Sequence, residues 1–242
     1  MVFTLVVIIA LFTLANQMVV QAADLTCIIG PHHKASPSPE PDIRADTACS
    51  RYSSLSCCTA NTSHSIDKQG ERELYNRHWD DCSVISTECE RYLKVESCFF
   101  SCDPYFGQWK TSQTEELPLA GLPVCASSCD EWFDACKDVP VCAQNWLTDF
   151  KEDNETGRLH CVTKTCRTFA EWYQNGKGLC ETIWGDGYRY VADNDNCMVF
   201  DFTGDNPNAN VTKDISGAHS FERRQSSLSF VLAFLSYIFL QF

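Results

Sequence analysis

Residues 125–136 read CASSCDEWFDAC, and this stretch decides how the rest of the chain is held. Cys125, Cys129, Trp132 and Cys136 recur at i, i+4, i+7 and i+11, which is one stripe along an α-helix. We therefore expect a helix whose buried face carries three cysteines and one indole. If each cysteine forms a disulfide, this helix is fastened to three other parts of the chain.

The chain contains 16 cysteines, an even number. A cytosolic protein would keep so many thiols reduced, whereas an exported protein oxidises them. In an exported chain we expect eight disulfides, which leave no thiolate as a nucleophile or zinc ligand. The spacing alone does not select one pairing among the many that are possible.

The N-terminal end has the pattern of a signal peptide over residues 1–22. An apolar run from Val2 to Leu14 is followed by small and polar residues up to Ala22. A transmembrane anchor is the alternative, but the run is short, and Asn16 and Gln17 interrupt it.

The C-terminal end has the pattern of a GPI-anchor signal. Ser216, Gly217 and Ala218 are small, a polar spacer follows them, and residues 228–242 are almost wholly apolar. This tail is shorter than the roughly 20 residues of a membrane-spanning helix. We expect residues 217–242 to be removed and the lipid to be attached at Ser216, with a tail-anchored or soluble form as the alternative. The mature part, residues 24–216, suits one domain.

Three asparagines lie in N-x-S/T sequons, which predicts a glycoprotein modified at Asn61, Asn154 and Asn210. Together with the two ends, they predict a location on the extracellular face of the plasma membrane, with a secreted form as the alternative. The chain carries 19 basic and 32 acidic residues, a net charge of −13. Such a surface repels nucleic acid and anionic headgroups, so the expected membrane contact is the lipid anchor.

Two further helices are expected. Thr168-x-x-Glu171 is a capping box that starts one helix, and the Asn-Gly pair at 175–176 is expected to stop it. The other is expected over residues 84–95 and presents Cys89.

The remaining sequence reads as loops and short strands. Alternating prolines in residues 36–41 (SPSPEP) exclude both helix and central strand, and no long periodic strand is present. We expect a small disulfide-rich α+β domain with several helices, short strands and long loops. In the chain-entropy model each disulfide stabilises such a fold by roughly 3 to 5 kcal/mol, without simple addition.

Several segments resemble the folate receptor family. They are residues 33–41 (HKASPSPEP), the pair Cys57-Cys58 followed by TAN, and residues 129–138 (CDEWFDACKD). Residues 142–150 (CAQNWLTDF) are most like the riboflavin-binding proteins within that family. Residues 200–208 (FDFTGDNPN) and the anchor signal look instead like the folate receptors. The likeness spans residues 27–208 and implies a folate-receptor-like fold.

The resemblance also implies a disulfide pairing, because the order of the cysteines matches the folate receptors one for one. The implied bridges are Cys27–Cys57, Cys49–Cys98, Cys58–Cys102, Cys82–Cys166, Cys89–Cys136, Cys125–Cys197, Cys129–Cys180 and Cys142–Cys161.

Members of this family hold a flat heterocycle between two aromatic rings, and the resemblance carries these positions to Phe100 and Trp184. The alternative is that both are ordinary core aromatics. Trp132 and Trp146 are expected to line or support the same pocket. Four polar residues that follow Trp184 are either ligand contacts or a solvated rim: Asp186, Tyr188, Arg189 and Tyr190.

A few polar positions bear on the choice of ligand. Glu96 stands where folate receptors carry an acid for the N–H donors of the pterin; the alternative is a surface glutamate at a helix end. The folate receptors hold the glutamate tail of folate with a Trp-Arg-rich loop, a His and a Lys. Here that loop (residues 111–117, TSQTEEL) is acidic, and Leu147 and Thr148 replace the His and Lys. Riboflavin has a neutral ribityl chain, so these positions favour it.

We therefore expect a cell-surface protein that binds riboflavin non-covalently for uptake or storage. A folate or pterin receptor is the second hypothesis. The third is a cell-surface recognition protein that has lost the ligand and binds a protein partner, as in gamete adhesion. No enzyme constellation, cofactor or metal site is expected, because the six histidines are scattered and the cysteines are oxidised. The pair His32-His33 is expected to be exposed.

Overall fold

The computed structural model describes residues 25–69, 76–109 and 120–211. The expected signal peptide, the acidic loop at 111–117, and Ser216 with the segment behind it lie outside these residues. No helix within the described part is both long enough and apolar enough to cross a membrane.

Helix α5 (Ala126–Cys136) confirms the prediction from the opening stretch. Cys125 is its N-cap residue, and Cys129, Trp132 and Cys136 are each at most 1% exposed. The helix is therefore bound through its buried face, as a stripe at this spacing requires. Its three disulfides are Cys125–Cys197, Cys129–Cys180 and Cys89–Cys136.

Helix α4 (Thr87–Cys102) presents Cys89 as expected but continues seven residues past the expected end at 95. Ser86 caps it by accepting a hydrogen bond from the Cys89 backbone N–H at 3.2 Å. Its last two turns are buried on almost every side, which hides the helical periodicity in the sequence. The helix stops before Asp103, which is followed by proline.

The capping box is present at the start of α6 (Phe169–Tyr173), where Thr168 and Glu171 bond each other's backbone N–H groups. The expected stop at 175–176 was wrong, because these residues begin another helix, α7 (Gly176–Ile183), which Asn175 caps. A Cβ at Gly176 would lie 2.7 Å from the backbone nitrogen of Asp130. The glycine is therefore required by the close approach of α7 to α5.

The strands are short, as expected. In the described part, β1 (Leu122–Cys125) and β6 (Tyr188–Val191) form a parallel pair in which Leu122 is opposite Tyr188. Two antiparallel pairs join β2 (Pro140–Val141) to β5 (Arg167–Thr168) and β3 (Phe150–Glu152) to β4 (Leu159–Cys161).

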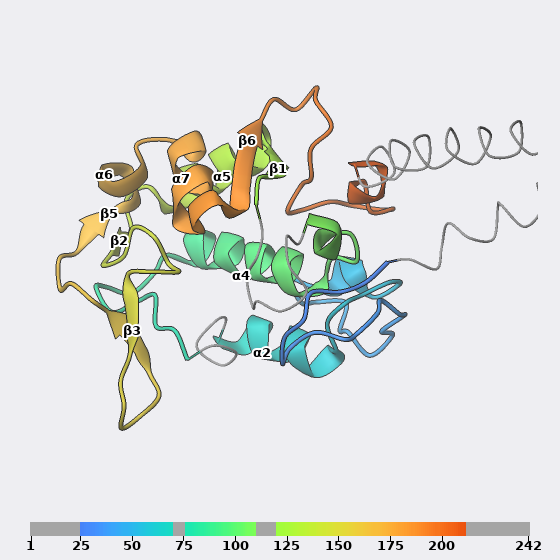
Figure 1. Cartoon of the computed structure of the whole chain (residues 1–242), viewed down its shortest axis with the longest axis horizontal. Coiled ribbons are helices and arrows are strands. Elements are labelled where there is room, and N and C mark those ends of the chain that lie inside the picture. The colour runs from blue at the N-terminus through green and yellow to red at the C-terminus, as the bar shows by residue number, and fades with distance from the viewer. Residues whose placement is uncertain (1–24, 70–75, 110–119, 212–242) are drawn as a thin grey trace, which may run out of the picture.

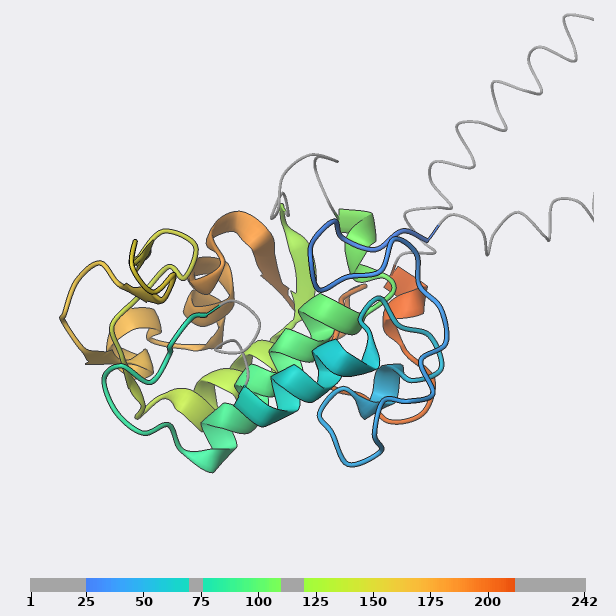
Figure 2. The ribbon, with the colours of Figure 1, turned by 90° about the horizontal axis from the view of Figure 1, so that it is seen from below.

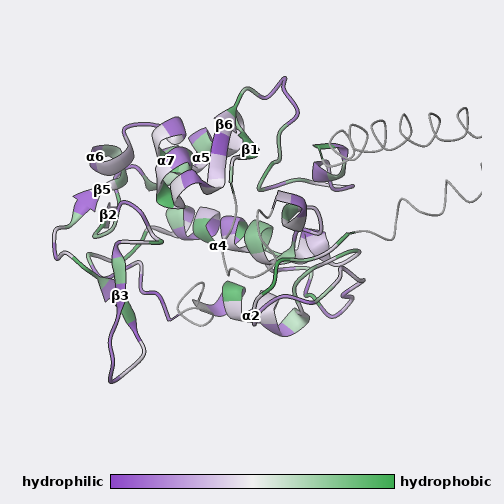
Figure 3. Cartoon of the chain, viewed as in Figure 1, coloured by the Kyte–Doolittle hydropathy of each residue, from purple (hydrophilic) through white to green (hydrophobic). Residues whose placement is uncertain are grey.

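Helix α4 is the centre of the molecule. Helix α2 (Ala60–Gln69) packs along one side of it and α5 along the other, and α7 packs on α5 (Figures 1 and 2). Hydrophilic and hydrophobic residues both occur along these helices (Figure 3). The described part also contains the short 3-10 helices η2 (Ser50–Tyr52), η3 (Phe106–Trp109) and η4 (Gly185–Gly187).

All 16 cysteines lie in the described part, and every one is in a disulfide. The eight bridges are the same pairs that the resemblance implies. Besides the three on α5, they are Cys27–Cys57, Cys49–Cys98, Cys58–Cys102, Cys82–Cys166 and Cys142–Cys161. The architecture is thus a small disulfide-rich α+β domain, as expected.

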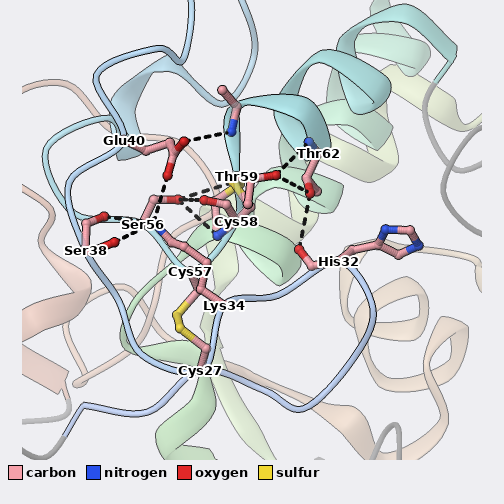
Figure 4. A network of polar contacts seen from close by, with 12 residues as sticks. Cys27, His32, Lys34, Ser38, Glu40, Ser56, Cys57, Cys58, Thr59 and Thr62 are labelled. Carbon is pink, nitrogen blue, oxygen red and sulfur yellow. Dashed lines mark hydrogen bonds and ion pairs between the residues drawn. A yellow bond between two sulfur atoms is a disulfide. The ribbon is translucent and has the colours of Figure 1, made fainter.

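The N-terminal arm, residues 27–41, is held against the start of α2 by a network of polar contacts (Figure 4). The Lys34 ammonium lies 3.0 Å from the Glu40 carboxylate, whose other oxygen accepts a hydrogen bond from the Ala60 backbone N–H. Thr62 donates to the carbonyl of His32. The prolines permit neither helix nor regular strand here, and the arm makes a single β-bridge, between Ser38 and Ser56.

Candidate ligand site

Phe100 lies in the last turn of α4 and is half-buried. Two rings contact its ring edge-on: Phe106 of η3 at 5.3 Å and His33 of the N-terminal arm at 5.2 Å between centroids. The His33 Nε2 atom also lies 3.4 Å from the Phe100 carbonyl oxygen. The arm therefore supports the position that the resemblance assigns to one wall of the pocket.

His33 is not exposed, so the expectation of an exposed His32-His33 pair was wrong. Both residues are half-buried, because the network around Lys34 holds the arm on the domain. Burial lowers the pKa of His33 from 6.5 to about 4, since a charged imidazole would lose hydration there. His33 is therefore neutral at neutral pH.

Glu96 lies one turn before Phe100 and is only 3% exposed, which excludes the alternative of a surface glutamate. The Tyr188 hydroxyl donates a hydrogen bond of 2.6 Å to its Oε1 atom. Tyr188 is buried at the start of β6, whereas Asp186 and Arg189 beside it are exposed. The Glu96–Tyr188 bond therefore joins the helix that carries Phe100 to the segment that follows Trp184.

Trp184 is the C-cap residue of α7 and is half-buried. Its ring meets the ring of Trp146 edge-on at 5.7 Å, and the guanidinium carbon of Arg77 lies 5.2 Å from its centroid. Gly185 follows with φ +58°, a left-handed conformation that turns the chain immediately after the indole. Trp184 is thus placed by a helix end and by aromatic neighbours.

Trp132 and Trp146 are both 1% exposed. Trp146 contacts Trp184 and also the rings of Trp79 and Phe150, so it supports the Trp184 position from the core. Trp132 contacts Phe200 at 5.8 Å and belongs to the same buried cluster, on the side of α5.

Leu147, one of the positions that bear on ligand choice, lies beside Gly185, the residue after Trp184. A Cβ at Gly185 would lie 3.8 Å from Leu147 Cδ1, and Leu147 is 40% exposed. The Thr148 hydroxyl donates to Asp149, whose other carboxylate oxygen accepts two backbone N–H groups, those of Gln144 and Asn145. Leu147 therefore places an uncharged side chain beside Gly185, while the Arg77 guanidinium lies against the Trp184 ring.

A second buried carboxylate, Asp103, lies at the end of α4, 1% exposed. Its Oδ2 atom accepts hydrogen bonds from Asn206 at 3.1 Å and Asn208 at 2.8 Å, and its Oδ1 atom accepts one from the Tyr105 backbone N–H. Burial outweighs these bonds and raises the pKa of Asp103 to about 6. Asp103 thus fastens the segment that leads to the C-terminus to the end of α4.

Three clusters in the described part bring together residue types that bind metals, but two of them consist of a disulfide and one aspartate. In the third, His78, Asp80 and Asp81 bring their ligand atoms within 4.8 Å of one another. Asp81 is already ion-paired with Arg158, which gives its carboxylate a structural partner. We assign this group to the packing of the β4 edge.

The three sequon asparagines, Asn61, Asn154 and Asn210, are all exposed. Asn61 lies in the first turn of α2, and Asn154 lies in the β3–β4 hairpin. Their glycosylation stays a prediction.

Comparison with known proteins adds the family context of this site. The model of the folate receptor family matches residues 26–199. Riboflavin-binding protein from Gallus gallus is 36% identical over 172 residues, which cover 71% of this chain and 70% of the relative. Riboflavin-binding protein from Dromaius novaehollandiae is 34% identical over 173 residues (72% and 70%). Folate receptor alpha from Bos taurus is 29% identical over 196 residues (77% and 79%). The chain belongs to the folate receptor family.

Proposed function

We propose that this protein binds a vitamin non-covalently, with riboflavin as the ligand, by stacking the isoalloxazine ring between Phe100 and Trp184. Family membership and the two riboflavin-binding relatives support a flat heterocyclic vitamin. The observation that carries the choice of riboflavin is Leu147, an uncharged, 40% exposed side chain against Gly185. A dianionic glutamate tail finds no cation at this position, whereas a neutral ribityl chain needs none.

The surroundings of Glu96 weaken the main argument for a pterin. A buried carboxylate suits the N–H donors of a pterin only if its oxygens are available to them. One of the two oxygens accepts the Tyr188 hydroxyl at 2.6 Å. Folate or a reduced pterin remains the second candidate, because Glu96 is the one acid in the described part at the position expected for that ligand.

Binding of this kind requires apolar faces and the removal of water. Offset aromatic pairs contribute roughly 0.5 to 1.5 kcal/mol each beyond the burial of their surface. The neutral His33 and the buried Phe106 keep the surroundings of Phe100 apolar. No covalent step is involved, and we assign the protein to carriers or receptors for uptake or storage rather than to enzymes.

The two ends of the chain complete the proposal. We infer that residues 1–22 are a cleaved signal peptide, that residues 24–216 form the mature glycoprotein, and that residues 217–242 are exchanged for a lipid at Ser216. The protein then lies on the extracellular face of the plasma membrane. Release from intact cells by a phosphatidylinositol-specific phospholipase tests the anchor, and a Ser216→Pro variant that still reaches the surface would contradict it.

Fluorescence titration tests the ligand. Riboflavin mixed with the purified mature domain is expected to lose most of its fluorescence, and folate is expected not to displace it. Trp184→Ala is expected to weaken binding, whereas the matched control Trp172→Ala, a half-buried tryptophan on α6, is expected to leave it unchanged. Unquenched riboflavin at micromolar protein refutes the proposal, and binding of folate alone selects the second candidate.

A further inference from the structure

Arg77 packs against the candidate site although the proposed function assigns it no role. Its guanidinium carbon lies 5.2 Å from the ring centroid of Trp184 and 5.4 Å from that of Phe150. Both distances are within the range in which a cation is attracted to an aromatic face. Arg77 therefore connects a ring of the β3–β4 hairpin to the indole at the end of α7.

The backbone of Arg77 is fixed as well. Arg77 pairs with Leu159 as an isolated parallel bridge beside β4, and the Asn76 carbonyl accepts the Leu159 N–H at 2.9 Å. Its Nε atom is buried. The backbone of Arg77 is held by a bridge, and its guanidinium contacts two rings. The side chain therefore loses little conformational freedom when it forms a contact, so it is a rigid support for a neighbouring ring.

The contact with Trp146 leaves the Trp184 indole free to tilt, and Arg77 can restrict this motion. Trp146 meets the indole edge-on, at an interplanar angle of 78°, so it limits one side of the ring without covering a face. A planar cation over the ring fixes its tilt, which stacking of a flat ligand requires.

We propose that Arg77 is a positioning residue of the ligand site: it holds the Trp184 indole in the orientation that stacks on the ligand. This rests on the proposed function in that riboflavin is the probe. Arg77 acts here through Trp184 and not through a charge on the ligand. Removal of Arg77 is therefore expected to weaken the binding of neutral riboflavin and of anionic flavin mononucleotide by similar factors.

A double-mutant cycle tests this role. Arg77→Met keeps the length of the side chain and removes the cation. It is expected to lower the affinity for riboflavin roughly 5- to 30-fold. Arg77→Lys keeps the charge and loses the planar face, so it is expected to restore binding only in part. In a Trp184→Phe background the effect of Arg77→Met is expected to shrink, because the two residues act as one unit.

The chain offers a matched control. Arg167 lies 4.9 Å from the ring centroid of Trp172 on α6, a cation–π pair of the same kind. Arg167→Met is expected to lower the unfolding midpoint less than Arg77→Met, because Arg167 is exposed, and to leave riboflavin affinity unchanged. Equal losses of affinity in both variants, or additive losses in the cycle, overturn the proposal. A loss confined to flavin mononucleotide overturns it as well, since that is charge recognition.

A readout without ligand separates this proposal from the proposed function. Quenching of tryptophan fluorescence by acrylamide is expected to rise in Arg77→Met, and the rise is expected to vanish in the Trp184→Phe background. If wild-type protein does not bind riboflavin but this pattern holds, the proposed function fails and the positioning role stands. If riboflavin binds and the pattern is absent, the positioning role fails alone.

Discussion

Replacement of His33 by glutamine is expected to make the domain more resistant to acid. His33 titrates near 6.5 in the unfolded chain and near 4 in the fold, because burial against Phe100 disfavours the charged ring. Its folded pKa is lowered, so its stabilising contribution is complete above about pH 6.5 and is lost as the pH falls toward 4. Between pH 7.5 and pH 5 this loss amounts to about 2 kcal/mol.

The wild-type protein alone does not reveal the whole of this loss, because Asp103 acts in the opposite direction. Its folded pKa, about 6, is raised above the value of about 3.8 for the unfolded chain. Protonation on acidification therefore favours the fold, by about 1 kcal/mol between the same two pH values. The two contributions have opposite signs and cancel in part, so the unfolding free energy of the wild type is expected to fall by less than the histidine alone would cause.

A comparison of His33→Gln with the wild type at both pH values isolates the histidine. Glutamine keeps an N–H donor for the Phe100 carbonyl, and any loss of packing is independent of pH. Urea denaturation with the disulfides intact, at pH 7.5 and pH 5, gives the difference in unfolding free energy between the two proteins. This difference is expected to move by about 2 kcal/mol in favour of the variant on acidification. A difference that stays constant with pH refutes the reasoning.

Three further predictions concern the buried polar groups and ligand choice. Asp103→Asn is expected to lower stability at pH 7 by about 1 to 3 kcal/mol, because an amide cannot accept all the donors around it; calorimetry at pH 7 checks this. Tyr188→Phe, which leaves the buried Glu96 without one donor, is expected to cost a similar amount in urea denaturation, and unchanged stability would show that the bond contributes nothing. The double change Leu147→His with Thr148→Lys is expected to raise affinity for folate at least tenfold in equilibrium dialysis; unchanged folate binding would show that these positions do not face the ligand's tail.

The regular parts of the fold could be predicted where one face of a helix is buried. Helix α5 follows from the spacing of Cys129, Trp132 and Cys136, since only one side of it meets the core. The end of α4 does not follow, because burial on nearly all sides removes the periodic signal. Helix α7 was missed because Gly176 reads as a helix stop, whereas it serves the close approach to Asp130.

The supporting residues of the candidate site could not be predicted for a different reason. His33 and Phe100 are 67 residues apart in the sequence, and their contact depends on an arm without secondary structure. The contact of Arg77 with Trp184 likewise joins distant segments. Sequence periodicity reports the neighbours of a residue within one element, so contacts between elements escape it. For Tyr188, which bonds Glu96, the sequence gives one weak indication: an aromatic residue four positions after Trp184.

The spacing between the two candidate walls is set by covalent bonds to one helix. Cys136 of α5 is bonded to Cys89 on α4, the helix that carries Phe100, and Cys129 of α5 is bonded to Cys180 on α7, which ends at Trp184. A change in ligand thickness would have to move two disulfide-bonded helices, which a close-packed interior resists. Leu147, in contrast, lies in a loop and is exposed, so a substitution there changes the charge beside the ligand without moving a helix. Under the proposed function, the disulfide-bonded helices would therefore set the spacing for a flat ring, and side chains on the loops would select among flat-ring vitamins.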